Sequence, residues 1–180
     1  MLTTLEPTIS LNNGSYFNFL EPENADFTVY DVANALSKIC RFTGQGDNFY
    51  SVAEHAIHVS YLVSEELAMD GLMHDATEFV IGDVSTPLKQ LLPEYKVIEL
   101  NIEKDMCRRF GLQFPLPKAV KYADTQMFYL EKELVINNFD DFDFLTGIEK
   151  PHIKLHFYNH REAKTAFLER YFELKRKREQ

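Results

Sequence analysis

An all-α, single-domain protein is the fold that this sequence predicts, and three observations predict it. Apolar residues recur at intervals of three and four between the turn signals, which is the spacing of one face of a helix. No segment shows a convincing strand pattern, and no repeat or low-complexity tract interrupts the chain. A length of 180 residues fits one domain with a sizeable core.

The first thirty residues are mixed in character, with turn signals at 12–14 and 21–24. A helix is expected from near Tyr30 to around residues 40–42, because two glycines then break its pattern. Its apolar face consists of Val32, Leu36, Ile39 and Cys40.

The next expected helix has Ser51 near its start and Glu54 three residues later, which is a capping-box arrangement. His55 and His58 both lie on this helix. Because its apolar residues cover most of its circumference, we expect it to lie at the centre of the domain. These residues are Val52, Ile57, Val59, Leu62 and Val63.

A histidine followed at once by an aspartate, His74 and Asp75, lies inside an apolar helical run over 67–81. Buried polar groups need partners, and imidazole with carboxylate forms a ligand set for a cation. Glu78 follows at helical spacing, so it can border the same pocket, and Asp83 comes after a glycine where the chain can turn back. From this run alone, a core histidine hydrogen-bonded to its neighbour remains an equal alternative.

The rest of the chain is expected to be helical with two interruptions. Segment 83–87 is expected to be extended, since a residue before proline avoids the helical region. Helices are expected over 94–110 and after a Pro-Leu-Pro turn, and the second of these carries Asp124 among its inward-facing residues. The acidic, aromatic segment 137–150 has no clear period and predicts a loop, and a last helix follows over about 159–177.

Composition limits the classes of partner and compartment. A formal net charge of −9 argues against nucleic acid as a partner, although a small phosphate ligand is compatible if a metal supplies local positive charge. Cys40 and Cys107 are far apart and predict buried thiols in a reducing compartment. We find no signal peptide and no apolar run that would span a membrane, and we therefore expect a cytoplasmic protein.

His55, His74, Asp75 and Asp124 together form a candidate metal site. Two imidazoles and two carboxylates suit a mononuclear centre with positions open to water and substrate. Each has an ordinary alternative, and Asp124 alone would be a solvated helix carboxylate. The order of His, His-Asp and Asp along the chain is much more specific than any one member.

This pattern resembles the HD-domain phosphohydrolase superfamily. The similarity covers about residues 15–135, and within the superfamily it is strongest to bacterial 5′-deoxynucleotidases and to the small viral dATP triphosphohydrolases of phages that use diaminopurine DNA. The motifs that carry it are Ala-Leu-Ser-Lys-Ile-Cys-Arg-Phe over 35–42, Phe-Tyr-Ser-Val-Ala-Glu-His over 49–55, Met-His-Asp-Ala-Thr-Glu over 73–78 and Gly-Asp-Val-Ser-Thr-Pro-Leu-Lys over 82–89.

The resemblance implies one HD-type helical bundle over 1–180, with a motif-bearing core at about 30–135. It implies one divalent transition metal per site, bound by the four residues named above. Zinc is the first choice, and cobalt, manganese and magnesium are also compatible with these ligands. Glu78, helped by Asp83, would position or deprotonate the attacking water. Related enzymes form dimers or hexamers, which predicts a homo-oligomer.

Five residues are candidates for contacts with the substrate. Arg41 and Lys89 are the expected phosphate ligands, with solvated cations as the alternative. Phe42 could stack on a base or pack in the core. Gly44 stands where the dATP-cleaving relatives carry a bulkier side chain, which leaves adenine selectivity open. Gln45 stands where relatives often carry histidine, and it is a candidate base contact.

The resemblance therefore predicts a metal-dependent deoxynucleotide phosphohydrolase in the cytoplasm, or in the host cytoplasm if the protein is viral. A dATP triphosphohydrolase, which converts dATP and water to deoxyadenosine and triphosphate and so removes dATP from the nucleotide pool, is favoured. A 5′-deoxynucleotidase acting on dNMPs would use the same ligands. A regulatory HD module that binds nucleotide without turnover is a third reading.

The remaining histidines are interpreted without a metal. His58 is expected to pack or to contact phosphate. His152, His156 and His160 recur every fourth residue, but the alternating apolar residues between them favour an extended segment. A surface or subunit contact is favoured over a second metal there. The alternating residues are Ile153, Leu155 and Phe157.

Overall fold

A short β-hairpin opens the described part of the chain in the computed structural model, which covers residues 7–180. Strands β1 (Thr8–Ser10) and β2 (Tyr16–Asn18) pair antiparallel, and Phe17 of β2 is fully buried. The expectation that no strand is present is wrong here, because strands of three residues are too short to show alternation. The turn signal around Gly14, which has a φ of 88°, marks the hairpin loop.

Helix α1 (Val29–Leu36) begins at a capping box in which the Thr28 hydroxyl and the Asp31 carboxylate each accept a backbone N–H at the helix start. The predicted end at 40–42 is wrong. The helix stops at Leu36 because the following backbone pairs with residues 50–52 instead. The Arg41 N–H donates to the Tyr50 carbonyl at 2.9 Å in that pairing.

Helix α2 (Val52–Leu62) lies at the centre, as predicted, and packs against α3, α7 and α8. The Ser51 hydroxyl accepts the Glu54 N–H at 3.1 Å. The predicted capping box is only half formed, because the Glu54 carboxylate accepts backbone N–H groups from residues 156–158 instead of returning to Ser51.

The helix predicted over 67–81 is divided in two by a turn. Helix α3 (Ala68–Met73) and helix α4 (Glu78–Ile81) are separated by residues 74–77, whose backbone forms tight hydrogen bonds three residues apart. Helix α5 (Thr86–Lys89) then begins inside the segment predicted to be extended, since Pro87 in a first helical turn requires no N–H bond.

The C-terminal half agrees with the prediction. Helix α6 (Pro93–Phe110) ends at Gly111, whose φ of 62° is left-handed, and α7 (Lys118–Leu134) follows. Residues 135–159 are mainly loop with one short 3₁₀ turn, and α8 (His160–Arg178) starts at a capping box.

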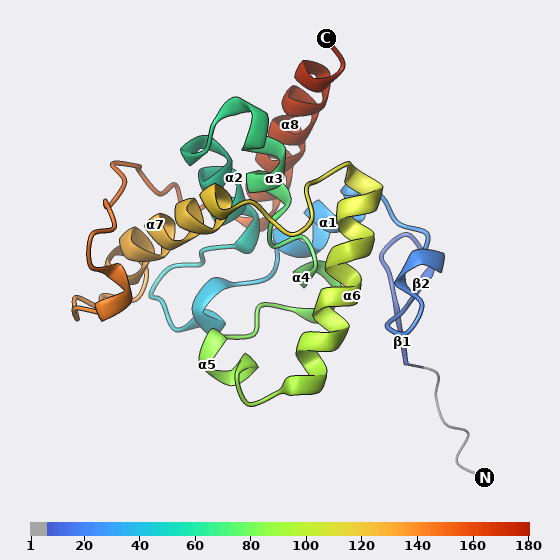
Figure 1. Cartoon of the computed structure of the whole chain (residues 1–180), viewed down its shortest axis with the longest axis horizontal. Coiled ribbons are helices and arrows are strands. Elements are labelled where there is room, and N and C mark those ends of the chain that lie inside the picture. The colour runs from blue at the N-terminus through green and yellow to red at the C-terminus, as the bar shows by residue number, and fades with distance from the viewer. Residues whose placement is uncertain (1–6) are drawn as a thin grey trace.

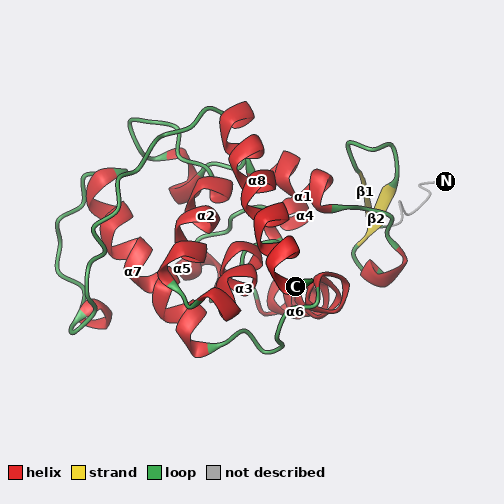
Figure 2. Ribbon diagram, turned by 90° about the horizontal axis from the view of Figure 1, so that it is seen from above, coloured by secondary structure: helices red, strands yellow, loops and turns green. Residues whose placement is uncertain are grey.

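The described residues form one mostly helical domain, in which α7 and the hairpin lie at opposite ends (Figures 1 and 2). Its main core lies among α1, α2, α3 and α8 and includes the buried side chains of Leu36, Leu72 and Phe167. A second apolar cluster joins α2 to α7 through Val59 and Met127. Over residues 7–180, no helix combines the length and the apolar character needed to cross a membrane.

Leu72→Ala should lower the free energy of unfolding by about 2–5 kcal/mol, because it leaves a cavity where α3 packs in the core. Leu91→Ala is the matched control, since this leucine is 76% exposed and its change should stay within about 0.5 kcal/mol. Urea denaturation followed by circular dichroism measures both. Equal effects of the two substitutions would contradict this description of the core.

Candidate metal centre

Three parts of the chain bring the four predicted ligands together. Helix α2 supplies His55, the turn after α3 supplies His74 and Asp75, and α7 supplies Asp124. The Nε2 atom of His55 lies 3.3 Å from Nε2 of His74 and 3.1 Å from Oδ1 of Asp124. Oδ2 of Asp75 lies 3.2 Å from the same His74 atom and 3.7 Å from that of His55.

The other nitrogen of each imidazole is already bonded, which fixes the direction of the ring. Nδ1 of His55 lies 2.6 Å from a carboxylate oxygen of Glu131, and Nδ1 of His74 lies 2.8 Å from the Gly71 carbonyl oxygen. Both acceptors lack a proton, so Nδ1 donates in each pair. In the neutral imidazoles, both Nε2 lone pairs therefore face the same point between the rings.

These residues fit one divalent transition ion. Ligand atoms bound to a single zinc at about 2.0–2.1 Å lie roughly 3.0–3.5 Å apart. The ligand atoms of His55, His74 and Asp124 all lie within 4.8 Å of one another, and the His74 Nε2 atom lies 3.9 Å from Oδ1 of Asp124. Hydrogen bonds from the outer nitrogens of ligating histidines are also typical of such sites. The Asp124 side chain is 42% exposed, so the cluster opens to solvent on that side.

Charges in the cluster strongly affect each other in the protein without an ion. Burial acts to lower the pKa of His74, but the Asp75 carboxylate outweighs it and raises the value to about 9. Burial acts to raise the pKa of Asp75, but His74, His55 and Arg41 outweigh it and hold the value well below its usual range. The cluster is thus an anionic environment that favours any cation, whether a proton or a metal.

Glu131 is a site residue that the sequence analysis missed. Its fully buried carboxylate contacts Nδ1 of His55, the Tyr50 hydroxyl at 2.8 Å and the Arg41 guanidinium at 3.1 Å. Burial would raise its pKa, but Arg41 and His55 lower it to about 2. Glu131 lies two helical turns after Asp124, and this spacing could have placed both residues on the same helix face. Its charged neighbours in the sequence instead favoured a solvated residue.

Glu78 and Asp83, the predicted catalytic pair, lie beside the cluster. Glu78 is 4% exposed at the start of α4, and one oxygen of its carboxylate has no hydrogen-bond partner among the described residues. Burial, together with the charges of Asp75 and Asp83, raises the pKa of Glu78 to about 9. Burial and Asp75 also raise the pKa of Asp83, although Arg41 opposes the shift.

The two predicted phosphate ligands are both in ion pairs. The Arg41 guanidinium is 11% exposed and lies 3.5 Å from Asp75 as well as 3.1 Å from Glu131. The Lys89 ammonium lies 2.5 Å from Glu99. The positive charge of Lys89 opposes the rise in the pKa of Glu78.

The residues predicted to contact the base form a turn directly after Arg41. Phe42 has a left-handed φ of 54°, an uncommon conformation for an aromatic residue, and Gly44 has a φ of 75°. The Phe42 ring lies 6.0 Å from that of Phe128 on α7 and under the Arg41 guanidinium. Gln45 is exposed at the end of the turn.

Comparisons with known proteins identify relatives of this chain. No protein-family model matches it. The chain is 42% identical over 120 residues to YfdR, an uncharacterized protein of Escherichia coli K12, and the match covers 67% of each protein. It is 34% identical over 137 residues to an uncharacterized protein of Rhodobacter capsulatus, covering 68% of this chain and 70% of the relative. The chain belongs to the family of YfdR. Neither name states an activity.

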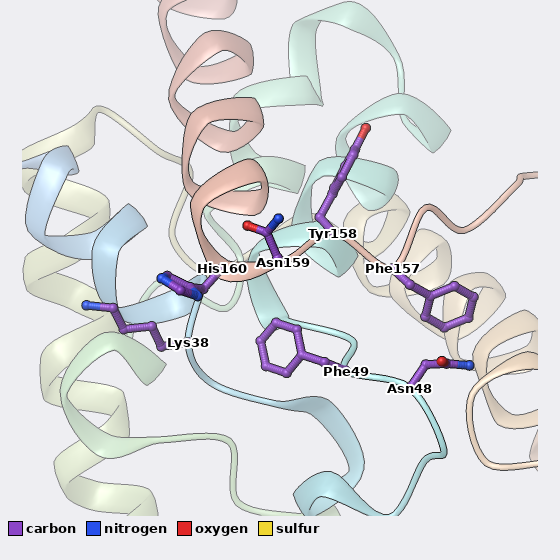
Figure 3. Close-up of a pocket in the computed structure, with 7 residues that line it drawn as sticks. All are labelled: Lys38, Asn48, Phe49, Phe157, Tyr158, Asn159 and His160. Carbon is purple, nitrogen blue, oxygen red and sulfur yellow. The ribbon is translucent and has the colours of Figure 1, made fainter.

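A separate surface cavity of about 410 Å³ lies where the loop before α2 meets the start of α8 (Figure 3). None of the predicted site residues lines it. Phe49 faces it, and the short segment that leads into α8 forms its other wall.

Glu131→Gln should reduce zinc affinity by about 10- to 100-fold, because the amide no longer provides a charged acceptor for Nδ1 of His55. Glu133→Gln, two residues further on the same helix and paired with Lys150, is the matched control and should bind zinc as the wild type does. Competition with a chromophoric chelator measures both affinities. An unchanged affinity in Glu131→Gln would show that this carboxylate does not support the ligand.

Proposed function

We propose that the protein is a metal-dependent deoxynucleotide phosphohydrolase of the HD-domain superfamily. The observation that carries this proposal is the convergence of His55, His74, Asp75 and Asp124, with both Nε2 atoms directed at one point. The resemblance of the motifs to that superfamily also supports it. The proposed cofactor is one divalent transition metal, with zinc the first choice.

A divalent ion supplies Lewis acidity at such a site, polarising a phosphoryl oxygen and making water more acidic. Glu78 is suited to accept the proton of the attacking water, since one of its oxygens is buried without a partner. A cation among the ligands would offset the repulsion from Asp75 and lower the raised pKa of Glu78, which makes Glu78 a better base at neutral pH. The carboxylate of Asp83 is proposed to assist Glu78 in positioning or deprotonating the water.

The proposed substrate is dATP. The water oxygen forms a bond to the α-phosphorus while the bond from phosphorus to O5′ breaks, and O5′ receives a proton as deoxyadenosine leaves. Triphosphate is then the second product. Lys89 is proposed to attract the phosphates, and the Phe42 ring is proposed to pack against the base. Gly44 and Gln45 are the remaining candidates for contact with the base.

One observation favours a second candidate, a 5′-deoxynucleotidase acting on dNMPs. A triphosphate brings more negative charge than a monophosphate and needs more cationic groups. Arg41 and Lys89 are both paired with carboxylates, so less of their charge is available to a long phosphate chain. A regulatory HD module that binds nucleotide without turnover is less well supported, because such a protein needs no base at the position of Glu78.

The proposal extends to the setting of the enzyme. The two free thiols, Cys40 and Cys107, agree with a reducing cytoplasm. A homo-oligomer, as a dimer or hexamer, is proposed from the resemblance, and its partners are small deoxynucleotides and not nucleic acid or membrane.

Product analysis tests the substrate. Metal-loaded protein incubated separately with dATP, dGTP, dCTP, TTP and dAMP should release deoxyadenosine and intact triphosphate from dATP. Phosphate from dAMP, with dATP untouched, would establish the nucleotidase instead. Chromatography of the nucleosides and phosphates distinguishes these results. No turnover of any of the five would contradict both enzymatic proposals and leave the binding module.

Two substitutions separate metal binding from proton transfer. Asp75→Ala should abolish activity and the binding of metal at the first centre, because it removes a ligand there. Glu78→Gln should keep the metal and lower kcat by about 10²- to 10⁴-fold, the usual contribution of a general base. Metal analysis and single-substrate kinetics measure the two effects. Retained turnover in both variants would overturn the assignment of the site, whereas Glu133→Gln should behave as the wild type.

A further inference from the structure

A second group of metal-binding residues lies on α2 and the segment before α8. Glu54, His58 and His156 each offer one ligand atom, and these atoms lie within 4.8 Å of one another. Glu54 and His58 are one helical turn apart, so both project from the same side of α2. His55 points instead to the first centre. The group shares no residue with the proposed hydrolase site.

His58 is the residue that indicates a ligand here. It is 6% exposed, and its Nε2 atom makes no hydrogen bond to the described residues. A buried polar atom without a partner is costly, and native structures seldom retain one. The nearest carboxylate oxygen, Oε1 of Glu54, lies 3.6 Å away, beyond hydrogen-bond distance but suited to two ligands of one ion.

Glu54 is fixed in place as a carboxylate. It accepts N–H bonds from the backbone of His156, Phe157 and Tyr158 at 2.7, 3.0 and 2.9 Å. A ligating carboxylate is typically supported by hydrogen bonds in this way. The same bonds bring the His156 side chain to the site.

His156 closes the group from the solvent side. Its ring is nearly parallel to that of His58, with an interplanar angle of 11° and centroids 5.8 Å apart, and it also stacks on Tyr158. The side chain of Phe157, the residue between His156 and Tyr158, points in a different direction from that of Tyr158 and borders the cavity (Figure 3). Because His156 is exposed, it can shift by the small amount needed to bind an ion at about 2 Å.

We propose that Glu54, His58 and His156 form a second binding site for a divalent transition metal, of the zinc class. Two imidazoles and one carboxylate are a known zinc ligand set, and the exposed side leaves a fourth position for water or an added ligand. This proposal differs from the interpretation from sequence, in which His58 and His156 have no metal. A bound ion would connect α2 to the segment before α8 through side chains. This link would add to the hydrogen bonds from the backbone of residues 156–158 to the Glu54 carboxylate.

Zinc stoichiometry tests this site. Metal-free full-length protein, titrated with zinc against a chromophoric chelator, should bind two equivalents. His156→Ala should bind one, and His152→Ala, an exposed histidine of the same segment outside the group, should bind two. His156 is exposed, so its removal should leave the fold intact, which circular dichroism checks.

Asp124→Ala makes the result independent of the proposed function. This substitution removes a ligand of the first centre, and the variant should still bind one equivalent of zinc at the second site. The double variant with His156→Ala should bind none. As a second measurement, zinc at about 100 times its dissociation constant should raise the Tm of Asp124→Ala by roughly 5–10 °C, with no comparable rise in the double variant. A single equivalent in the wild type that His156→Ala leaves unchanged would overturn the second site while sparing the first.

Discussion

The buried contact between Glu131 and Nδ1 of His55 is the interaction on which the site depends. It joins α7 to the central helix, and it turns the imidazole so that Nε2 faces the other predicted ligands. Asp75, Asp124 and Glu131 carry three negative charges, and the Arg41 guanidinium among them carries one positive charge. The formal excess of two negative charges is the charge that one divalent cation balances. Without an ion, a proton on His74, whose pKa is raised to about 9, offsets part of this excess.

Helix α2 has a second role because adjacent residues point to different sides of it. His55 faces α7 and the turn after α3, whereas Glu54 faces the segment that leads into α8. One helix therefore fixes both the proposed metal ligand His55 and the path of the chain 102 residues after Glu54. Apolar packing of α2 on α3 and α8 provides the rigid support that both groups of polar side chains need.

The sequence was sufficient for most helices and for selecting four candidate ligands that lie close together, and it failed where tertiary contacts override local pattern. Helical spacing and a proline turn placed α6 and α7 correctly. The same spacing placed the end of α1 too late in the sequence. Ile39 and Cys40 keep the apolar period, but their backbone pairs with residues near Ser51. Glu131 was overlooked because nothing local distinguishes a buried carboxylate with three partners from a solvated one. Glu54 was assigned to a capping box because the backbone N–H groups that its carboxylate accepts belong to residues distant in sequence.

The acidity of the chain bears on how an anionic nucleotide could bind. At a formal net charge of −9, the protein repels phosphate at long range, and Arg41 and Lys89 are already paired with carboxylates. A divalent ion in the first centre would neutralise the excess negative charge of its carboxylates and so remove the repulsion that a phosphate meets there. It follows that metal and nucleotide should bind cooperatively, since each is stabilised by the charge of the other. On this argument, the proposed metal contributes to substrate affinity as well as to the chemistry, and both rest on the ring orientation that Glu131 sets.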